Sequence, residues 1–471
     1  MKIKVNYIYT LLAIIIILAF ILRIYSLGNP VLWFDETISA ITAESILHHG
    51  IPIYDSGLVI KSTLLFHYSL AFFTFILGNT DFAVRFASVL FGLCTVLLAF
   101  FIGREFSQNE KQGNFIGLAS ALLTAVFYLE VLYSRQARFY QLFQLLFFLT
   151  LFFLYKSKNN NKYSWFTCIS LIFLLDTQIE GLLVLGLMFV FFFLDKKPWK
   201  FYIIPVLALI WYGKSLFYLP LGDSSLASTY LETYSSSLLY RLRAFFFISL
   251  LGIPLAYKAN KRLSLIIIVP TILTLLGLLF IKVFAIRYAY FSILLVLILI
   301  SVLLGFLYKH NKILAILVLL LLVLYPSNLF FSSGNLTIIK PESLQTLSNT
   351  EPVLDYKSLS DSTKQDIIDS PLVVLSSPGV EWYLKKPDYV ISFSLNGLDS
   401  GFEVYNEKDV YTGAELFNLK NPQISQFILI EGAFGYAKLS SESREYLDSL
   451  KESCSLVEES SNVKVYSCNL Q

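Results

Sequence analysis

Two adjacent carboxylates follow closely after the first apolar segment of the sequence, in the run Trp33-Phe34-Asp35-Glu36. An ionised carboxylate held in a fixed direction can take a proton from a hydroxyl group as that hydroxyl attacks, so both acids are candidate catalytic residues. The alternative is structural, because Asp35 is a good helix N-cap and Glu36 would complement the helix dipole. The two roles are compatible, and position alone favours the cap.

Basic residues near the ends of apolar segments form a second group of candidates. A guanidinium group binds phosphate through paired hydrogen bonds, so several such cations together would suit an anionic lipid headgroup. The alternative is snorkelling, in which long basic side chains reach the headgroups from helix ends; it accounts for one or two of them. The candidate phosphate-binding residues are Lys61, Arg135, Arg138, Tyr140, Arg287 and Tyr288.

Two further acids, Asp176 and Glu180, lie at the junction of two later apolar segments. Acids so close to a membrane are costly unless they are solvated or used, so we expect them to bind an acceptor; capping of the next helix is the alternative. Three histidines, His48, His49 and His67, have no common metal-site spacing. No metal site is predicted, and a divalent metal cofactor is not supported.

The composition is that of a membrane protein. Of 471 residues, 56% are hydrophobic and 15% are charged, against about a quarter charged in an average soluble protein. The net charge is only +3 and no basic cluster is present, so we predict no nucleic-acid partner. The lipid bilayer is the expected partner, and the apolar run from Tyr7 to Leu27 is interpreted as a retained first span.

Eleven segments are candidate membrane spans, because a spanning helix needs about 20 apolar residues. They are 7–27, 83–102, 115–133, 140–155, 164–180, 182–194, 201–219, 244–257, 263–280, 289–307 and 313–331. Alternate loops between them are basic, which predicts a cytoplasmic N-terminus and an outer C-terminus. To preserve this charge pattern, the short apolar stretch 63–77 is assigned to an interfacial or re-entrant helix within a long first outer loop, 28–82.

From about Ser332 the sequence becomes more polar, which predicts a second domain. The segments 372–376, 389–393, 427–431 and 463–467 are typical of buried strands, and Ser440–Ser453 is typical of a helix. The predicted fold is an α-helical polytopic membrane protein, 1–331, followed by a small extracytoplasmic α/β domain, 332–471. Cys454 and Cys468 are expected either to form a disulfide or to pack as two small buried residues.

The order and spacing of these residues resemble the GT-C membrane glycosyltransferases. The nearest groups are the dolichyl-phosphate-mannose protein mannosyltransferases, their prokaryotic glycosyltransferase family 39 relatives and the lipid A aminoarabinose transferases. The resemblance covers about residues 7–330. The residues that carry it are Trp33-Phe34-Asp35-Glu36 with Ala40 and Gly50, Phe82-Ala83-Val84-Arg85-Phe86 with Gly92, Gly117, Tyr133 to Tyr140, and Arg287-Tyr288.

The resemblance implies a GT-C-like transmembrane catalytic domain and a hexosyl- or pentosyltransferase activity. Such enzymes move a sugar from a polyprenyl-phosphate donor, such as dolichyl or undecaprenyl phosphate, to an extracytoplasmic protein, lipid or glycan, with inversion. By resemblance, Asp35 is the general base, and Arg138, Arg287 and Lys61 hold the donor phosphate. The chain departs from the pattern at Ile60 and Gln136, where relatives often have Glu, and this removes support for a metal site.

Two other classes of function compete with this one. A flippase or transporter of lipid-linked sugars would need polar residues within the spans and internal pseudo-repeats, whereas the charged candidates lie near the ends of spans. A structural membrane protein that binds a partner through its outer domain would need none of Asp35, Arg138 and Arg287.

Overall fold

The chain forms two compact units in a computed structural model. The residues that the structure describes are 7–213, 242, 244–279, 286–324, 354–375, 377–391, 404–405, 408–409, 411–419, 422–432, 436, 439, 441–460 and 462–470. Unit 1 comprises Met1–Tyr25 and Ser88–Leu344, and unit 2 comprises Ser26–Ala87 and Gln345–Gln471. Unit 2 therefore joins the predicted first outer loop to the predicted C-terminal domain. The division at residue 331 stays a prediction.

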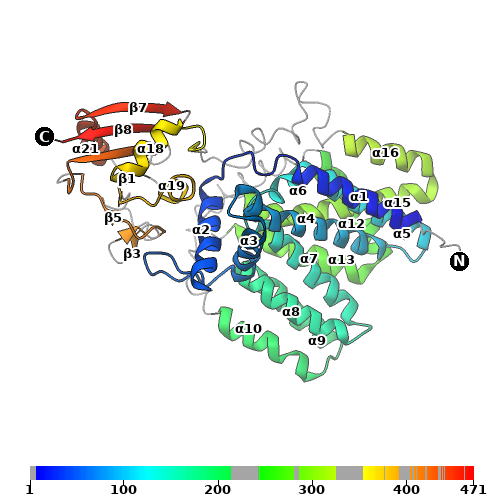
Figure 1. Cartoon of the computed structure of the whole chain (residues 1–471). Coiled ribbons are helices and arrows are strands. Elements are labelled where there is room, and N and C mark those ends of the chain that lie inside the picture. Colours follow the sequence, from blue (N-terminus) through cyan, green and yellow to red (C-terminus); the bar gives the residue numbers. More distant parts are fainter. Residues whose placement is uncertain are drawn as a thin grey trace. The chain divides into compact units, whose positions relative to one another are not determined.

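Unit 1 is a bundle of apolar helices (Figure 1). Its elements are α1 (Tyr7–Ile24), α5 (Glu110–Val126), α6 (Tyr128–Tyr133), α7 (Tyr140–Ser157), α8 (Lys162–Thr177), η1 (Ile179–Gly181), α9 (Leu182–Leu194), η2 (Trp199–Phe201), α10 (Ile203–Gly213), α12 (Ala244–Ala259), α13 (Lys261–Leu278), α14 (Ile286–Ala289), η4 (Tyr290–Ser292), α15 (Ile293–His310) and α16 (Lys312–Leu324). A further helix, α4 (Asp81–Arg104), begins in unit 2 and continues in unit 1. Each predicted span overlaps one or more of these helices, and the span ends 214–219 and 325–331 lie outside the described residues.

Length and hydropathy fit a membrane protein. Five described helices are long and apolar enough to cross a membrane, and five more apolar helices are shorter. The core of unit 1 lies where α15 packs on α5 and α12, and α7 packs on α8. Large apolar side chains such as Phe193 and Trp211 face outward, as a lipid-facing surface requires. The stretch predicted as an interfacial helix forms α3 (Leu64–Leu77), in unit 2.

The predicted span 115–133 is broken at Phe127, between α5 and α6. A break exposes backbone carbonyls that need partners inside a membrane. Arg23 of α1, which is fully buried, donates to the carbonyl oxygens of Ala125 at 2.9 Å and Thr124 at 3.2 Å. One buried arginine thus supplies hydrogen bonds to the carbonyl groups at the end of α5.

Close packing at Gly92 of α4 makes room for this arginine. A Cβ atom on Gly92 would lie 2.7 Å from the Cβ of Ser134 and 2.8 Å from the Nε of Arg23. Both distances are below any normal contact, so the site requires glycine for space.

We expect Gly92→Ala to lower the free energy of unfolding by about 1–3 kcal/mol, because the extra methyl group overpacks the site. Gly186 of α9 is a matched control, since nothing lies within 4 Å of its added Cβ. Gly186→Ala should be neutral or stabilising by up to about 1 kcal/mol through helix propensity. Thermal unfolding of the two detergent-purified variants tests this, and equal melting temperatures would contradict it.

Unit 2 contains a sheet with the strand order β3-β4-β5-β2-β1-β6-β8-β7 (Figure 1). Its strands are β1 (Leu372–Val374), β2 (Tyr389–Val390), β3 (Val404–Tyr405), β4 (Lys408–Asp409), β5 (Glu415–Leu416), β6 (Gln426–Gly432), β7 (Cys454–Ser460) and β8 (Val463–Asn469). The central strands β5, β2, β1 and β6 run parallel, and the outer pairs run antiparallel. The four predicted strand segments correspond to β1, β2, β6 and β8.

Helices complete unit 2: α2 (Phe34–His49), α3, α18 (Asp361–Asp369), α19 (Ser377–Tyr383) and α21 (Ser441–Lys451). Helix α19 packs against α2, so the first outer loop and the sheet domain form one body. Cys454 and Cys468, paired across β7 and β8, form a disulfide, which decides between the two alternatives left by the sequence. The predicted fold class, a mostly helical membrane protein with a small C-terminal sheet domain, is confirmed.

Candidate functional site

The candidate base, Asp35, lies in the first turn of α2 and is half-buried. The N-cap of this helix is Trp33, whose φ of −80° and ψ of 168° are extended. The interpretation of Asp35 as the N-cap is therefore wrong, because Asp35 occupies the second helical position. The Trp33 amide instead donates to Glu36 Oε2 at 3.3 Å, as an N3 glutamate does in a capping box.

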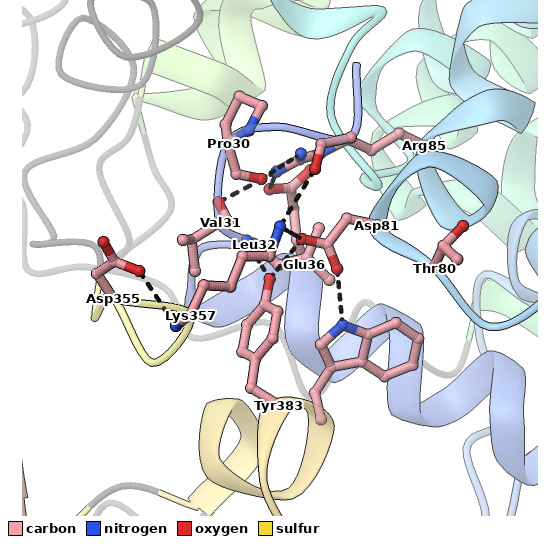
Figure 2. A network of polar contacts seen from close by, with 12 residues as sticks. Pro30, Val31, Leu32, Glu36, Thr80, Asp81, Arg85, Asp355, Lys357 and Tyr383 are labelled. Carbon is pink, nitrogen blue, oxygen red and sulfur yellow. Dashed lines mark hydrogen bonds and ion pairs between the residues drawn. The ribbon is translucent and has the colours of Figure 1, made fainter. Parts of the chain in front are cut away.

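Glu36 is held by a buried arginine, Arg85 of α4, within unit 2. Arg85 Nε lies 2.8 Å from Oε1 and Nη2 lies 2.7 Å from Oε2, and the two side chains are 3% and 1% exposed. Arg85 also donates to the carbonyl oxygens of Leu27, Pro30 and Val31, at 3.0, 2.7 and 3.2 Å. Figure 2 shows this guanidinium group between the carboxylate and the backbone of the entering chain.

This bidentate pair favours a positioning role for Glu36 over proton transfer, because both carboxylate oxygens already accept hydrogen bonds. The pair also explains why an arginine lies near the end of this predicted span. Arg85 binds other parts of the protein there, rather than lipid headgroups. The pair fixes the chain path from Leu27 to Glu36 and with it the start of α2.

We expect Glu36→Gln to destabilise the fold by about 3 kcal/mol, because a buried guanidinium would lose its counter-charge. Glu44→Gln on the same helix is the control, since Glu44 is half-exposed and its contacts with Asn79 and His48 lie at the surface. Its effect should stay below about 1 kcal/mol. Thermal unfolding measures both, and a Glu36→Gln variant as stable as Glu44→Gln would refute the structural role.

Lys61, the third predicted site residue in unit 2, is exposed just before α3. Two residues later Thr63 has a φ of 56°, in the left-handed region that a β-branched side chain rarely adopts. Such strain needs support from the surroundings and often marks a functional turn. The strained turn therefore keeps Lys61 among the candidates.

Four of the predicted phosphate-binding residues come together in unit 1. The guanidinium of Arg138 lies 5.6 Å from the ring centre of Tyr140, and that of Arg287 lies 5.7 Å from the ring centre of Tyr288. The two tyrosine rings meet edge to face at 6.2 Å. Two arginines from distant parts of the sequence are thus held on one pair of aromatic rings.

Arg135 has a different surrounding from Arg138. It is buried, and its Nη1 atom donates to the carbonyl oxygens of Leu22, Arg23 and Tyr25, at 3.2, 3.1 and 2.7 Å. These carbonyls lie at the end of α1, so Arg135 caps that helix. The contacts favour a structural role for Arg135 over phosphate binding.

Asp176 lies in the last turn of α8 and Glu180 in η1, both half-buried in unit 1. The two acids therefore flank one junction between helices, as the sequence indicated. Their role toward an acceptor stays a prediction.

A buried polar network in unit 1 was missed by the sequence reasoning. Gln144 Nε2 donates to Glu130 Oε1 at 2.8 Å. The single hydroxyl proton of Tyr290 is shared between Glu130 Oε2, at 2.8 Å, and Gln141 Oε1, at 2.6 Å. All four side chains are almost fully buried. These residues lie near the ends of the predicted spans 115–133, 140–155 and 289–307, and they are buried within the helical unit. The signal was available in Gln141 and Gln144, which interrupt an apolar run at helical spacing.

Glu381 of α19 is a second missed residue. Its Oε2 atom is buried and has no hydrogen-bond partner within the described part of the chain. Burial, and then the nearby charge of Asp55, raise the pKa of this carboxyl to about 8; Asp409 and Glu44 act in the same direction, and Lys386 opposes them. Glu381 is therefore mostly protonated at neutral pH. No group of three or more His, Cys, Asp or Glu in the described ranges has the arrangement of a metal site.

Comparisons with known proteins show what this architecture is similar to. Residues 61–212 match the family described as dolichyl-phosphate-mannose-protein mannosyltransferase. The structure of ArnT from Cupriavidus metallidurans bound to undecaprenyl phosphate superposes with a TM-score of 0.64 and 12% identity, over 98% of both chains. The chain has the GT-C fold. The resemblance seen in the sequence is confirmed.

A second structure with this GT-C fold is more distant. The oligosaccharyltransferase AglB from Archaeoglobus fulgidus, in complex with an inhibitory peptide and a dolichol-phosphate, superposes with a TM-score of 0.52 and 11% identity. The match covers 81% of this chain and 64% of AglB. A search of the curated proteins finds no match. This chain thus shares the fold of ArnT and AglB, and residues 61–212 match a mannosyltransferase family.

Proposed function

We propose that this protein transfers a sugar from a polyprenyl-phosphate donor to an acceptor outside the cytoplasm, by a single displacement with inversion. Asp35 takes the proton from the acceptor hydroxyl as its oxygen attacks the anomeric carbon. The bond between that carbon and the carrier phosphate breaks at the same time, and the phosphate leaves with the electron pair. The products are the glycosylated acceptor and the free polyprenyl phosphate.

The phosphate-binding part of the proposal rests on Arg138 and Arg287. Negative charge grows on the leaving phosphate in the transition state, and fixed cations stabilise it. Aromatic faces hold a guanidinium group through cation–π attraction, and a guanidinium group matches the geometry of a phosphate. The pairing of these two arginines on Tyr140 and Tyr288, in the fold of a protein solved with undecaprenyl phosphate, is the observation that carries the proposal.

The predicted orientation of the protein in the membrane supports the same reaction. The basic loops predict a cytoplasmic N-terminus and an outer C-terminal domain, and the disulfide of Cys454 and Cys468 suits an oxidising compartment. The protein is then a multi-pass protein of the cell membrane with Asp35 on the outer side. Lys61 is proposed as a further cation toward the phosphate, and Asp176 and Glu180 as contacts of the acceptor, which is a protein, a lipid or a glycan.

We expect Asp35→Asn to lower the rate of sugar transfer about 100- to 10,000-fold, because a positioned general base contributes that much. Membranes containing the variant are incubated with undecaprenyl phosphate carrying labelled mannose, glucose or aminoarabinose, and transferred label is counted. Asp361→Asn is the control, since Asp361 is an exposed residue at the start of α18.

Full activity in Asp35→Asn would end the proposal. Movement of intact labelled lipid across the membrane, without cleavage of its sugar–phosphate bond, would favour the flippase instead.

We expect Arg138→Gln to weaken binding of undecaprenyl phosphate to the purified protein about 10- to 100-fold, as the loss of a charge-assisted hydrogen bond implies. Arg287→Gln should behave alike. The control is Arg104→Gln, because Arg104 is a half-buried arginine of unit 1 in the last turn of α4. Titration of the three variants with undecaprenyl phosphate separates them, and unchanged affinity in Arg138→Gln would remove this residue from the phosphate site.

A further inference from the structure

The hydroxyl group of Tyr383, in the C-terminal domain, lies between two segments of the first outer loop. It accepts a hydrogen bond from the backbone amide of Leu32 at 2.7 Å and donates one to Asp81 Oδ2 at 2.7 Å (Figure 2). Leu32 stands three residues before Asp35, and Asp81 is the first residue of α4. All these residues belong to unit 2. One tyrosine therefore links the approach to α2 with the start of α4.

Asp81 is the centre of this contact. Besides Tyr383, it accepts a hydrogen bond from Trp382 Nε1 at 2.9 Å and pairs with Lys357 Nζ at 2.6 Å. Lys357 also donates to the carbonyl oxygen of Gly28 at 3.2 Å. Three side chains of the C-terminal segment thus converge on one buried carboxylate of the first outer loop.

A second contact from the C-terminal domain reaches the residue next to Asp35. The ring of Tyr411 meets Phe34 edge to face at 6.3 Å and Tyr54 at 5.4 Å. The adjoining turn lies directly on the loop, because a Cβ on Gly413 would be 2.7 Å from the carbonyl carbon of Asp55. With a φ of +65°, Gly413 also has a backbone conformation suited to glycine.

These contacts fix the rotation of α2 around its own axis. Successive residues of a helix point about 100° apart, because a turn contains about 3.6 residues. Phe34 contacts Tyr411 and Glu36 is paired with Arg85. Together these contacts fix the direction in which the side chain of Asp35, the residue between them, leaves the helix. The hydrogen bond from the Leu32 amide to Tyr383 fixes the position along the helix axis at which α2 begins.

We propose that the C-terminal domain positions the general base, with Tyr383 as the principal positioning residue and Tyr411 as the second. This inference rests on the proposed function. Tyr383 acts through the backbone at Leu32 and through Asp81, and takes no part in proton transfer. The sheet domain is thereby part of the catalytic apparatus, in addition to any contact that it makes with the acceptor.

Tyr383→Phe tests the proposal, because it removes only the hydroxyl group. Turnover is measured with the undecaprenyl-phosphate sugar that the wild-type protein accepts, and hydrogen–deuterium exchange is followed in peptides covering residues 28–36. We expect kcat to fall about 10- to 100-fold, as a misplaced catalytic group implies. The KM for the donor should change less than about twofold, since the proposed phosphate ligands lie mainly in unit 1. Exchange at residues 28–36 should become faster.

Tyr436→Phe is the matched control. Tyr436 also donates from its hydroxyl to a carboxylate, Asp448 Oδ2, at 2.8 Å, and both residues belong to the C-terminal domain. Its kcat and its exchange at residues 28–36 should match the wild-type protein. At the second contact, Tyr411→Ala should lower kcat and Tyr411→Phe, which keeps the ring, should restore it.

The outcomes separate this inference from the proposed function. Full activity in Asp35→Asn would remove the base and the proposed reaction with it. An inactive Asp35→Asn together with wild-type kcat in Tyr383→Phe would retain the reaction and overturn the positioning role. Equal losses in Tyr383→Phe and Tyr436→Phe would also overturn it, because they would indicate a general loss of stability.

Discussion

The ion pair of Glu36 and Arg85 is the contact on which the candidate site depends. Burying either charge alone would be costly, so each stays only because the other is present. Arg85 has more donors than one carboxylate can accept, and the rest bind the backbone of residues 27–31. The pair therefore organises an irregular stretch of chain and sets where α2 begins. The position of Asp35 in the first turn of α2 therefore depends on this pair.

The arginines near the helix ends divide into two kinds by what they contact. Arg23, Arg85 and Arg135 donate to backbone carbonyls at helix ends and turns, where a protein within a membrane must satisfy its own polar groups. Arg138 and Arg287 contact tyrosine rings. The distinction matters because all five have the same side chain and similar places relative to the spans.

Much of the fold could be predicted from the sequence because its signals are local. Apolar runs predicted the helices of unit 1, and short apolar segments between polar ones predicted β1, β2, β6 and β8. Strands β3, β4, β5 and β7 were not predicted: the first three have two residues each, and β7 is mostly exposed. Cysteine spacing could not decide the disulfide, because only the register of β7 and β8 brings the two residues opposite each other.

The site was predictable in its residue types but not in its contacts. The run 33–36 indicated carboxylates at a helix start, yet Trp33 became the N-cap because Glu36, fixed by Arg85 from 49 residues away, supplies the cap hydrogen bond. Arg135 and Arg138 are three residues apart and look equivalent in the sequence, which does not show that Arg135 caps the end of α1. Glu130 and Tyr290 are 160 residues apart, so their hydrogen bond has no local signature.

Unit 2 is built from two stretches of chain, 26–87 and 345–471, with most of unit 1 between them. This arrangement has a consequence for biogenesis. While the ribosome is still making the intervening helices, Asp81 has neither Tyr383 nor Trp382 to bind, and Phe34 lacks the ring of Tyr411. Closing so long a loop is slow, and it comes after the membrane helices have been made. In the proposed reaction, Asp35 therefore gains its fixed position only after the segment that carries Tyr383 and Tyr411 has been made.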